Sequence, residues 1–264
     1  MTTATRIKNP KGSQRVDSGL CALALMTKAP RAGKAKTRLT PPLTSAEAMD
    51  LSICFLRDTA QVISLAIEKG VNAAGMAVYT PVGEEEWYEG IIPDKFHLIP
   101  QRGDSLGDRL ILAADDLFAI GFESVCLIGS DSPTLPPIFY EDAVRRLLRP
   151  GDRIVLGPSD DGGYYLIGLK KLQRGIFQRI DWSTKYVFSQ TVERAAEIGI
   201  EVDVLPKWYD VDDGDSLSRL CRELFEPTSN NERAYDAPHT RSYLEKLLLS
   251  QGRDYISGRK DAMT

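Results

Sequence analysis

Residues 20–27 read LCALALMT, a short run that is apolar almost throughout. A strand buried on both faces of a parallel sheet has this pattern, because helices cover both faces and keep its side chains out of water. Similar apolar runs recur along the chain and alternate with segments of helical periodicity. We therefore expect βαβ units and a single α/β domain, in which a mainly parallel central sheet carries helices on both faces.

The expected elements follow from this alternation and from the residues that cap the helices. Strands are expected over residues 20–27, 73–80, 95–100, 123–129, 153–158, 164–169 and 201–206. Helices are expected over residues 44–69, 105–121, 183–199 and 240–250, and from about residues 136 and 216. Thr44 with Glu47 forms a capping box for the first helix, and Ser183 or Thr184 is expected to cap the helix over 183–199.

The chain of 264 residues is 42% hydrophobic, which is enough for one large core. Residues 1–18 are polar and basic without periodicity, and we expect a loose arm there. The folded domain is expected over residues 19–226, with a linker and a helical extension over 227–264. The sequence leaves the oligomeric state open, a homodimer included.

The composition argues against several classes of protein. A net charge of −4 is unlike a nucleic-acid-binding protein, which carries a basic face. The apolar runs are shorter than the roughly 20 residues that a membrane span needs, and LCALALM is too short for a cleaved leader. The four cysteines lie far apart without a CxxC pair, as expected of reduced thiols. We therefore expect a cytoplasmic protein.

Five cations lie within eleven positions directly after the first expected strand. They are Lys28, Arg31, Lys34, Lys36 and Arg38. Ligands of open parallel sheets bind outside the carboxyl ends of the strands, so this basic loop, residues 28–38, faces the expected crevice. Arginine and lysine together suit a diphosphate. We expect Lys28, Lys36 and Arg38 to bind phosphates, with Gly33 allowing close approach of the backbone; a solvated charged loop is the alternative.

Two acidic motifs follow later strands of the expected sheet. IGSDSPTL, residues 128–135, places Asp131 directly after one strand, and YDVDDGDSL, residues 209–217, follows the last strand. Carboxylate oxygens suit Mg²⁺ or Mn²⁺, which neutralises phosphate charge during group transfer. Asp131 is therefore a candidate metal ligand, although helix capping would also explain it. Asp210 and Asp212 share one side of an extended segment and are candidates for a second ligand or a base.

Helix capping also accounts for part of the second motif, which we call the acidic segment, residues 209–217. Either Asp213 or Asp215 is well placed to cap the helix expected near residue 216, because a carboxylate accepts hydrogen bonds from the first backbone N–H groups. We expect that structural role for one of them.

A glycine pair lies in PSDDGGYYLIG, residues 158–168. Gly162 and Gly163 would let a ligand approach the backbone, and Asp160 or Asp161 would hold sugar hydroxyls or act on an acceptor. A hairpin turn explains an Asp-Gly pair equally well.

Two further motifs are weaker candidates. GDSLGDRL, residues 103–110, opens a helix whose N-terminus would attract an anion near Gly107 and Arg109. DWST adds Trp182, whose ring would stack on a sugar or a base, and Ser183 beside it, although core packing explains a tryptophan at least as well.

Taken together, these motifs resemble those of a known family. KAPRAGKAKTRL, GDSLGDRL, IGSDSPTL, GPSDDGGYYLIGL, DWST and DVDDGDSL occur in the order found in DUF2064 proteins and cover about residues 20–225. These proteins are glycosyltransferase-like members of the nucleotide-diphospho-sugar transferase superfamily with a GT-A fold, and one branch is labelled arsenosugar biosynthesis glycosyltransferase. The layout is also similar to that of molybdenum-cofactor and phospholactate nucleotidyltransferases, whose first loop binds a nucleoside triphosphate.

The resemblance implies a GT-A-like transferase domain in which the three cations named above bind phosphates. It also implies Asp131 as the ligand of a divalent cation, Mg²⁺ or Mn²⁺, and Asp212 as a second ligand. The central motif is DSP instead of the DxD of typical GT-A glycosyltransferases, which leaves room for nucleotidyl transfer.

Three functions follow as expectations. The first is a metal-dependent glycosyltransferase that moves a sugar from a nucleotide-diphosphate sugar to a small-molecule acceptor, with Asp161 or Asp212 assisting the acceptor. The second is a nucleotidyltransferase acting on a nucleoside triphosphate. The third is a nucleotide-binding protein without turnover.

Overall fold

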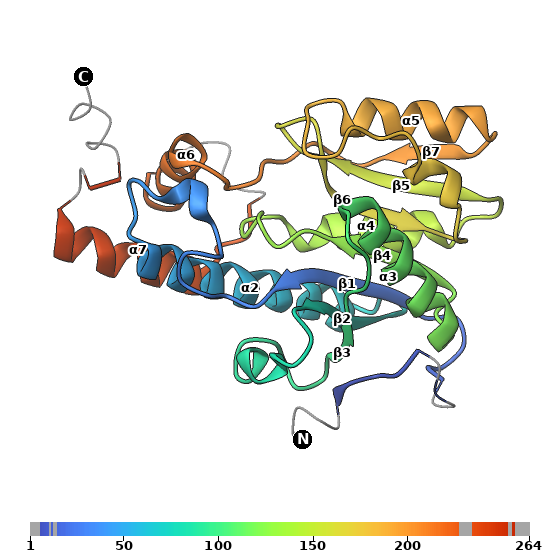
Figure 1. Ribbon diagram of the computed structural model, residues 1–264, viewed down its shortest axis with the longest axis horizontal. Coiled ribbons are helices and arrows are strands. Elements are labelled where there is room, and N and C mark those ends of the chain that lie inside the picture. The colour runs from blue at the N-terminus through green and yellow to red at the C-terminus, as the bar shows by residue number, and fades with distance from the viewer. Residues whose placement is uncertain (1–5, 11, 13–14, 227–233, 253–254, 257–264) are drawn as a thin grey trace.

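A seven-stranded sheet runs through the molecule in the order β3-β2-β1-β4-β6-β5-β7 (Figure 1). The computed structural model describes residues 6–10, 12, 15–226, 234–252 and 255–256. The strands are β1 (Cys21–Lys28), β2 (Ala73–Thr80), β3 (His97–Pro100), β4 (Ser124–Ile128), β5 (Arg153–Pro158), β6 (Tyr164–Leu169) and β7 (Glu201–Val204). β6 runs antiparallel to β4 and β5, whereas the other neighbouring strands pair in parallel. The expected, mainly parallel sheet is confirmed.

Helices cover both faces of this sheet. They are α2 (Ser45–Glu68), α3 (Leu106–Ile120), α4 (Pro137–Leu147), α5 (Val187–Glu197), α6 (Gly214–Phe225) and α7 (Pro238–Gln251). Alternate residues of β1 enter two cores: Leu23 and Leu25 pack with α2 and α4, while Ala22 and Ala24 pack with α3 and α5. This two-sided burial explains why the β1 sequence is apolar at successive positions. The expected helices on both faces are confirmed, and the fold is a single α/β domain.

A third apolar cluster lies at one end of the sheet, where α2, α6 and α7 pack together (Figure 1). It contains Leu39 of the short 3₁₀ helix η1 (Thr37–Leu39), as well as Tyr209 and Val211 of the acidic segment. Leu39, directly after the basic loop, and the acidic segment therefore share one hydrophobic cluster. Rigid packing beneath both loops fixes the side chains that they carry on the other side.

The helix α7 is capped by a side chain from α2. Asp58 is fully buried, and its carboxylate accepts hydrogen bonds from the backbone N–H groups of His239 (3.0 Å) and Thr240 (2.8 Å). These N–H groups lie in the first turn of α7, where they have no carbonyl partner within the helix. Burial raises the pKa of Asp58 above its ordinary value, while these hydrogen bonds work in the other direction. Asp58 thus fixes α7 on the domain.

Replacing Asp58 by alanine should lower the free energy of unfolding by about 1–3 kcal/mol, because buried N–H groups lose their acceptor. Urea unfolding of the full chain measures this. Glu68→Ala is the matched control on the same helix, since Glu68 pairs with Lys95 at the surface (2.8 Å) and such pairs contribute less than about 1 kcal/mol. Equal losses in the two variants would contradict the capping role.

The helix expected over residues 183–199 begins later, at Val187, with Tyr186 at its N-cap. Ser183 has a φ of 64°, which is outside the helical region. The Thr184 hydroxyl donates to the carbonyl of Asp181 (2.7 Å) and accepts from the N–H of Tyr186 (3.3 Å), so it closes a turn before the helix. The expected cap at Ser183 or Thr184 was wrong, because short hydroxyl side chains also bond the local backbone in turns.

Residues 6–8, which were expected in a loose arm, pack against the edge of the sheet. Arg6 is 2% exposed, and its guanidinium donates to the carbonyl oxygens of Phe96 (3.1 Å) and Pro93 (2.8 Å). Ile7 forms an isolated parallel bridge with Leu98 of β3. The expectation was wrong for these residues, since a buried arginine that pairs with distant carbonyls leaves no periodic pattern in the sequence.

Parts of the expected arm and linker, residues 1–5, 11, 13–14 and 227–233, lie outside the described residues. The domain boundaries predicted from the sequence stay predictions. Within the described part of the chain, no helix combines the length and the hydropathy that a membrane crossing requires.

Candidate active site

The basic loop and both acidic motifs line one cleft at the carboxyl ends of β1 and β4. The cleft has a volume of about 260 Å³ and is lined by Thr27, Lys28, Lys34, Ala35, Lys36, Thr37, Arg38, Ser52, Leu56, Ser130, Asp131 and Asp212. Parallel strands end at the same edge of a sheet, which is why segments so far apart in the sequence meet here. The structure thus brings together the cations and the carboxylates that the sequence analysis singled out.

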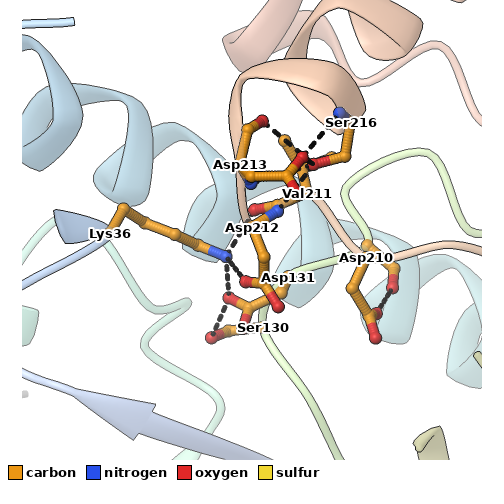
Figure 2. Close-up of polar contacts among 9 residues, drawn as sticks. Lys36, Ser130, Asp131, Asp210, Val211, Asp212, Asp213 and Ser216 are labelled. Atoms are coloured by element: carbon orange, nitrogen blue, oxygen red, sulfur yellow. Dashed lines mark hydrogen bonds and ion pairs between the residues drawn. The ribbon is translucent and has the colours of Figure 1, made fainter. Parts of the chain in front are cut away.

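Figure 2 shows Lys36 reaching between Asp131 and Asp212. Its Nζ atom lies 2.8 Å from Oδ1 of Asp131 and 2.9 Å from Oδ1 of Asp212, and it donates to the carbonyl oxygen of Val211 at 2.7 Å. The ammonium also lies 5.6 Å from the centre of the Phe55 ring. An ammonium has three N–H groups, so these three oxygen acceptors use all of them.

Lys36 is almost completely buried, with 8% of its side chain exposed. Burial opposes its charge, but Asp131 and Asp212 outweigh burial and raise the pKa of Lys36 above its ordinary value. The ammonium therefore stays charged and ties the two carboxylates together. In this structure Lys36 organises the acids of the cleft, and a direct contact of Lys36 with phosphate stays a prediction.

The other cations of the cleft are Lys28, Lys34 and Arg38, and all three are exposed. Lys28 and Arg38 were expected to bind phosphate, whereas Lys34 was noted as a member of the charge run and given no role. Lys34 lines the cleft and directly follows Gly33, which does not. Gly33 has a φ of 70° within the turn that precedes Lys34. This turn requires the left-handed conformation that glycine adopts easily.

The acidic segment is held in place by its own backbone and by α6. The N–H of Val211 donates to the carbonyl oxygen of Asp131 (2.8 Å), which aligns the two acidic motifs. Asp213 is the N-cap of α6, accepting from the N–H of Ser216 at 2.9 Å, so the expected capping role is confirmed for Asp213. The Ser216 hydroxyl also accepts from the N–H of Asp212 at 2.9 Å. The Asp212 carboxylate is thereby fixed at the rim of the cleft.

Asp210 does not line the cleft; it lies apart from Lys36 and accepts a hydrogen bond from the hydroxyl of Ser132 at 2.5 Å (Figure 2). Burial raises the pKa of Asp210 to about 6; the Ser132 hydrogen bond opposes this rise, and the charges of Asp131, Asp161 and Asp212 add to it. Several carboxylates therefore lie near one another. From their alternate spacing, Asp210 and Asp212 were expected to share one side of the segment. The Asp210 carboxylate instead faces the hydroxyl of Ser132.

The two acids of the β5–β6 turn have structural partners. Oδ1 of Asp160 lies 3.1 Å from Nζ of Lys207, and Oδ2 lies 2.6 Å from Nη1 of Arg219. Oδ1 of Asp161 accepts from the N–H of Gly163 (2.8 Å) and from the Ser159 hydroxyl. The turn that the Asp-Gly pair also allowed is therefore present, and the proposed contacts of Asp160 and Asp161 with substrate stay predictions.

Gly162 is required by packing against the loop before α5. Its φ is 89°, and a Cβ atom at this position would lie 2.2 Å from the carbonyl oxygen of Lys185. Its own carbonyl oxygen accepts from the N–H of Phe188 at 2.9 Å. Close approach of the chain to itself accounts for this glycine, and a ligand contact at Gly162 stays a prediction.

The α3 N-terminus was expected to attract an anion, but its own side chains already cap it. Ser105 and Asp108 form a capping box, which places a carboxylate at this end of the helix. A Cβ atom on Gly107 would lie 2.6 Å from Nε1 of Trp182, so the indole covers the first turn. Arg109 donates from Nε to the carbonyl oxygen of Gly103 at 3.2 Å. These residues and the exposed Ser183 are not among those lining the cleft.

The carboxylates of the cleft fit a divalent cation of the Mg²⁺ or Mn²⁺ type. Asp131 and Asp212 already converge on one positive atom, Nζ of Lys36, and their side chains are 40% and 39% exposed. Among the described residues, no group of three His, Cys, Asp or Glu side chains is arranged to hold a metal ion. Mg²⁺ commonly binds through one or two carboxylates together with substrate phosphates and water, and the donor set matches that mode.

Comparison with known proteins adds a partial family match and a fold. The family model described as "Uncharacterized protein conserved in bacteria (DUF2064)" matches residues 65–184. This range includes Asp131 and Asp161, whereas Lys36 and Asp212 lie outside it. A search of curated proteins found no match.

Several solved structures are similar to this chain. One is described as a "putative nucleotide-diphospho-sugar transferase" from Desulfovibrio desulfuricans G20; it is 29% identical with a TM-score of 0.77, covering 90% of this chain and 99% of that one. A nucleotidyl transferase from Methanothermobacter thermautotroptrophicus is 14% identical with a TM-score of 0.52, and the match covers 77% of this chain and 96% of that one. CMP:2-keto-3-deoxy-manno-octonic acid synthetase, complexed with CTP, is 11% identical with a TM-score of 0.50, covering 76% and 97%.

The last two structures are similar in fold alone. The Desulfovibrio protein is similar over nearly the whole of both chains. The chain is therefore similar to DUF2064 proteins in its central part, and as a whole it has the fold of nucleotidyltransferases and nucleotide-diphospho-sugar transferases.

Proposed function

We propose that this protein is a metal-dependent glycosyltransferase that moves a sugar from a nucleotide-diphosphate sugar to a small-molecule acceptor. The observation that carries the proposal is the shared cleft, where exposed cations of the basic loop face Asp131 and Asp212. Cations for phosphates and carboxylates for a divalent ion are the groups that transfer from a nucleotide requires.

The cations would bind the diphosphate of the donor. Lys28, Lys34 and Arg38 are exposed in the cleft and would neutralise the charge that grows on the diphosphate as the sugar leaves. A volume of about 260 Å³ suits the diphosphate, because complete ligands of drug size occupy roughly 300–1,000 Å³. The nucleoside and the sugar would extend from the cleft on either side.

The acids would hold the divalent cation. When bound by Asp131 and Asp212, Mg²⁺ or Mn²⁺ would neutralise further phosphate charge. Lys36 keeps these carboxylates close together, although their like charges repel. Asp161 stays our candidate for accepting the proton of the acceptor. Its Oδ1 atom already accepts hydrogen bonds within the turn, so Oδ2 would be the oxygen that accepts the proton.

Product analysis tests the reaction class. The protein is incubated with Mn²⁺, a panel of nucleotide sugars or nucleoside triphosphates, and a broad acceptor panel, and the products are identified by mass spectrometry. Release of a nucleoside diphosphate with a glycosylated acceptor supports the proposal. Release of pyrophosphate with a nucleotidylated acceptor would replace it with nucleotidyl transfer, and nucleotide binding without product would favour a protein without turnover.

The exposed cations should control diphosphate affinity. Lys28→Ala and Arg38→Ala should each weaken binding of magnesium pyrophosphate about tenfold, because each removes a charge-assisted hydrogen bond. Isothermal titration calorimetry measures the affinity. Lys171→Ala is the control, since Lys171 is 71% exposed, pairs with Asp152 at 4.0 Å and does not line the cleft. Affinities that stay unchanged in the two cleft variants would remove the phosphate role of the basic loop.

A further inference from the structure

A pair of cations lies beside the acidic segment but outside the cleft. Lys207 precedes the acidic segment in the sequence, and Arg219 belongs to α6, the helix that follows it. Both pair with Asp160, which offers one carboxylate to two positive charges. Asp160 therefore holds the two cations side by side. The side chains of Lys207 and Arg219 are 58% and 49% exposed, so solvent and ligands reach them.

Arg219 is held in a fixed orientation. The carbon at the centre of its guanidinium lies 3.8 Å from the centre of the Tyr209 ring, which is buried in the cluster beneath the acidic segment. Stacking on a buried ring and a 2.6 Å contact with Asp160 restrain the group before any ligand arrives. A guanidinium has five N–H donors, so a stacked and paired arginine still has donors to offer to an anion.

The cations are also linked in sequence to the carboxylates. The N–H of Trp208 donates to the carbonyl oxygen of Pro158 (3.1 Å), and the N–H of Val211 donates to that of Asp131 (2.8 Å), so this piece of chain is tied at both ends. Asp160, which contacts both cations, directly precedes Asp161, the candidate for accepting the proton of the acceptor, and the Cα atoms of neighbouring residues lie about 3.8 Å apart. A small molecule of a few carbons therefore suffices to reach from the cations to Asp161.

We infer that Arg219 and Lys207 form a binding site for an anionic group, a phosphate or a carboxylate, on the acceptor substrate. This inference rests on the proposed function, since it places the acceptor beside Asp160 and Asp161. Asp160 orients the two cations, and the acceptor anion would bind to their exposed N–H groups. A neutral acceptor of the same size would lack this contact and bind more weakly.

Calorimetric titration of the full chain tests the site. With magnesium pyrophosphate saturating the basic loop, sn-glycerol 3-phosphate, glycerate and glycerol are titrated in turn. We expect the phosphate, the carboxylate or both to bind and glycerol not to bind. Arg219→Ala and Lys207→Ala should each weaken anion binding about tenfold while leaving pyrophosphate affinity unchanged.

Arg222→Ala is the control, because it removes an exposed arginine from the same helix. Failure of both anions to bind the wild-type protein would overturn the inference, as would an equal loss in the control. If pyrophosphate itself does not bind, the proposed function fails, and the same titrations without pyrophosphate then decide on this site: anion binding that Arg219→Ala loses would keep it, and no anion binding would overturn it.

Discussion

Lys36→Met is expected to lower the free energy of unfolding by about 3 kcal/mol, since breaking a buried ion pair by removing one partner costs about 3–5 kcal/mol. We expect the lower end of this range because Asp131 and Asp212 are 40% and 39% exposed, and water screens part of their repulsion. The carbonyl of Val211 would also lose its donor at 2.7 Å. Urea unfolding measures the loss, with Lys34→Met, an exposed residue of the same loop, as the control.

A divalent cation should partly restore this variant. With the ammonium gone, Mg²⁺ would be the cation between the two carboxylates, and a ligand that binds only the folded state raises its stability. We therefore expect millimolar Mg²⁺ to raise the melting temperature of Lys36→Met by more than that of the wild-type protein. A melting temperature of Lys36→Met that Mg²⁺ leaves unchanged would mean that Asp131 and Asp212 do not share a cation.

Asp131→Asn is expected to weaken metal-dependent binding of pyrophosphate by more than about 100-fold, because loss of a residue that merely supports a metal ligand already costs about 10–100-fold. Asparagine keeps the Oδ1 acceptor at the 2.8 Å contact with Lys36, so the fold should lose only about 1 kcal/mol. Calorimetric titration with Mn²⁺ present and absent separates the two effects.

Asp215→Asn serves as the control for Asp131→Asn. Asp215 belongs to the same acidic segment but lies in the first turn of α6 and does not line the cleft. Its variant should bind pyrophosphate and metal as the wild-type protein does. Metal dependence that persists in Asp131→Asn would remove the ligand role of Asp131.

Much of the fold follows from the sequence because each buried strand is marked by its own residues. The β1 run is apolar on both faces, and its alternate residues do enter two different cores. The meeting of Lys36 with Asp131 was also predictable, since the ends of parallel strands share one edge of a sheet. The capping box at Thr44 depends on residues three positions apart and was predictable from the local sequence, whereas the sequence left the cap of α6 open between Asp213 and Asp215.

Contacts between distant segments account for what the sequence did not reveal. Arg6 is buried by carbonyl groups about 90 residues away, and Trp182 covers Gly107 although β4, β5 and β6 lie between them in the sequence. Lys36 was expected to face a phosphate, yet its three acceptors come from two loops whose spacing only the folded chain sets. Tertiary partners of this kind leave no periodicity and no local motif to recognise.

The most direct test of the central claim is a crystal structure of the protein with Mn²⁺ and pyrophosphate, in which anomalous scattering locates the metal. We predict one Mn²⁺ ion bound by carboxylate oxygens of Asp131 and Asp212, and pyrophosphate in contact with Lys28, Lys34 or Arg38. Manganese and pyrophosphate found together elsewhere on the molecule, with Lys36 still holding both carboxylates in an empty cleft, would contradict the proposed site.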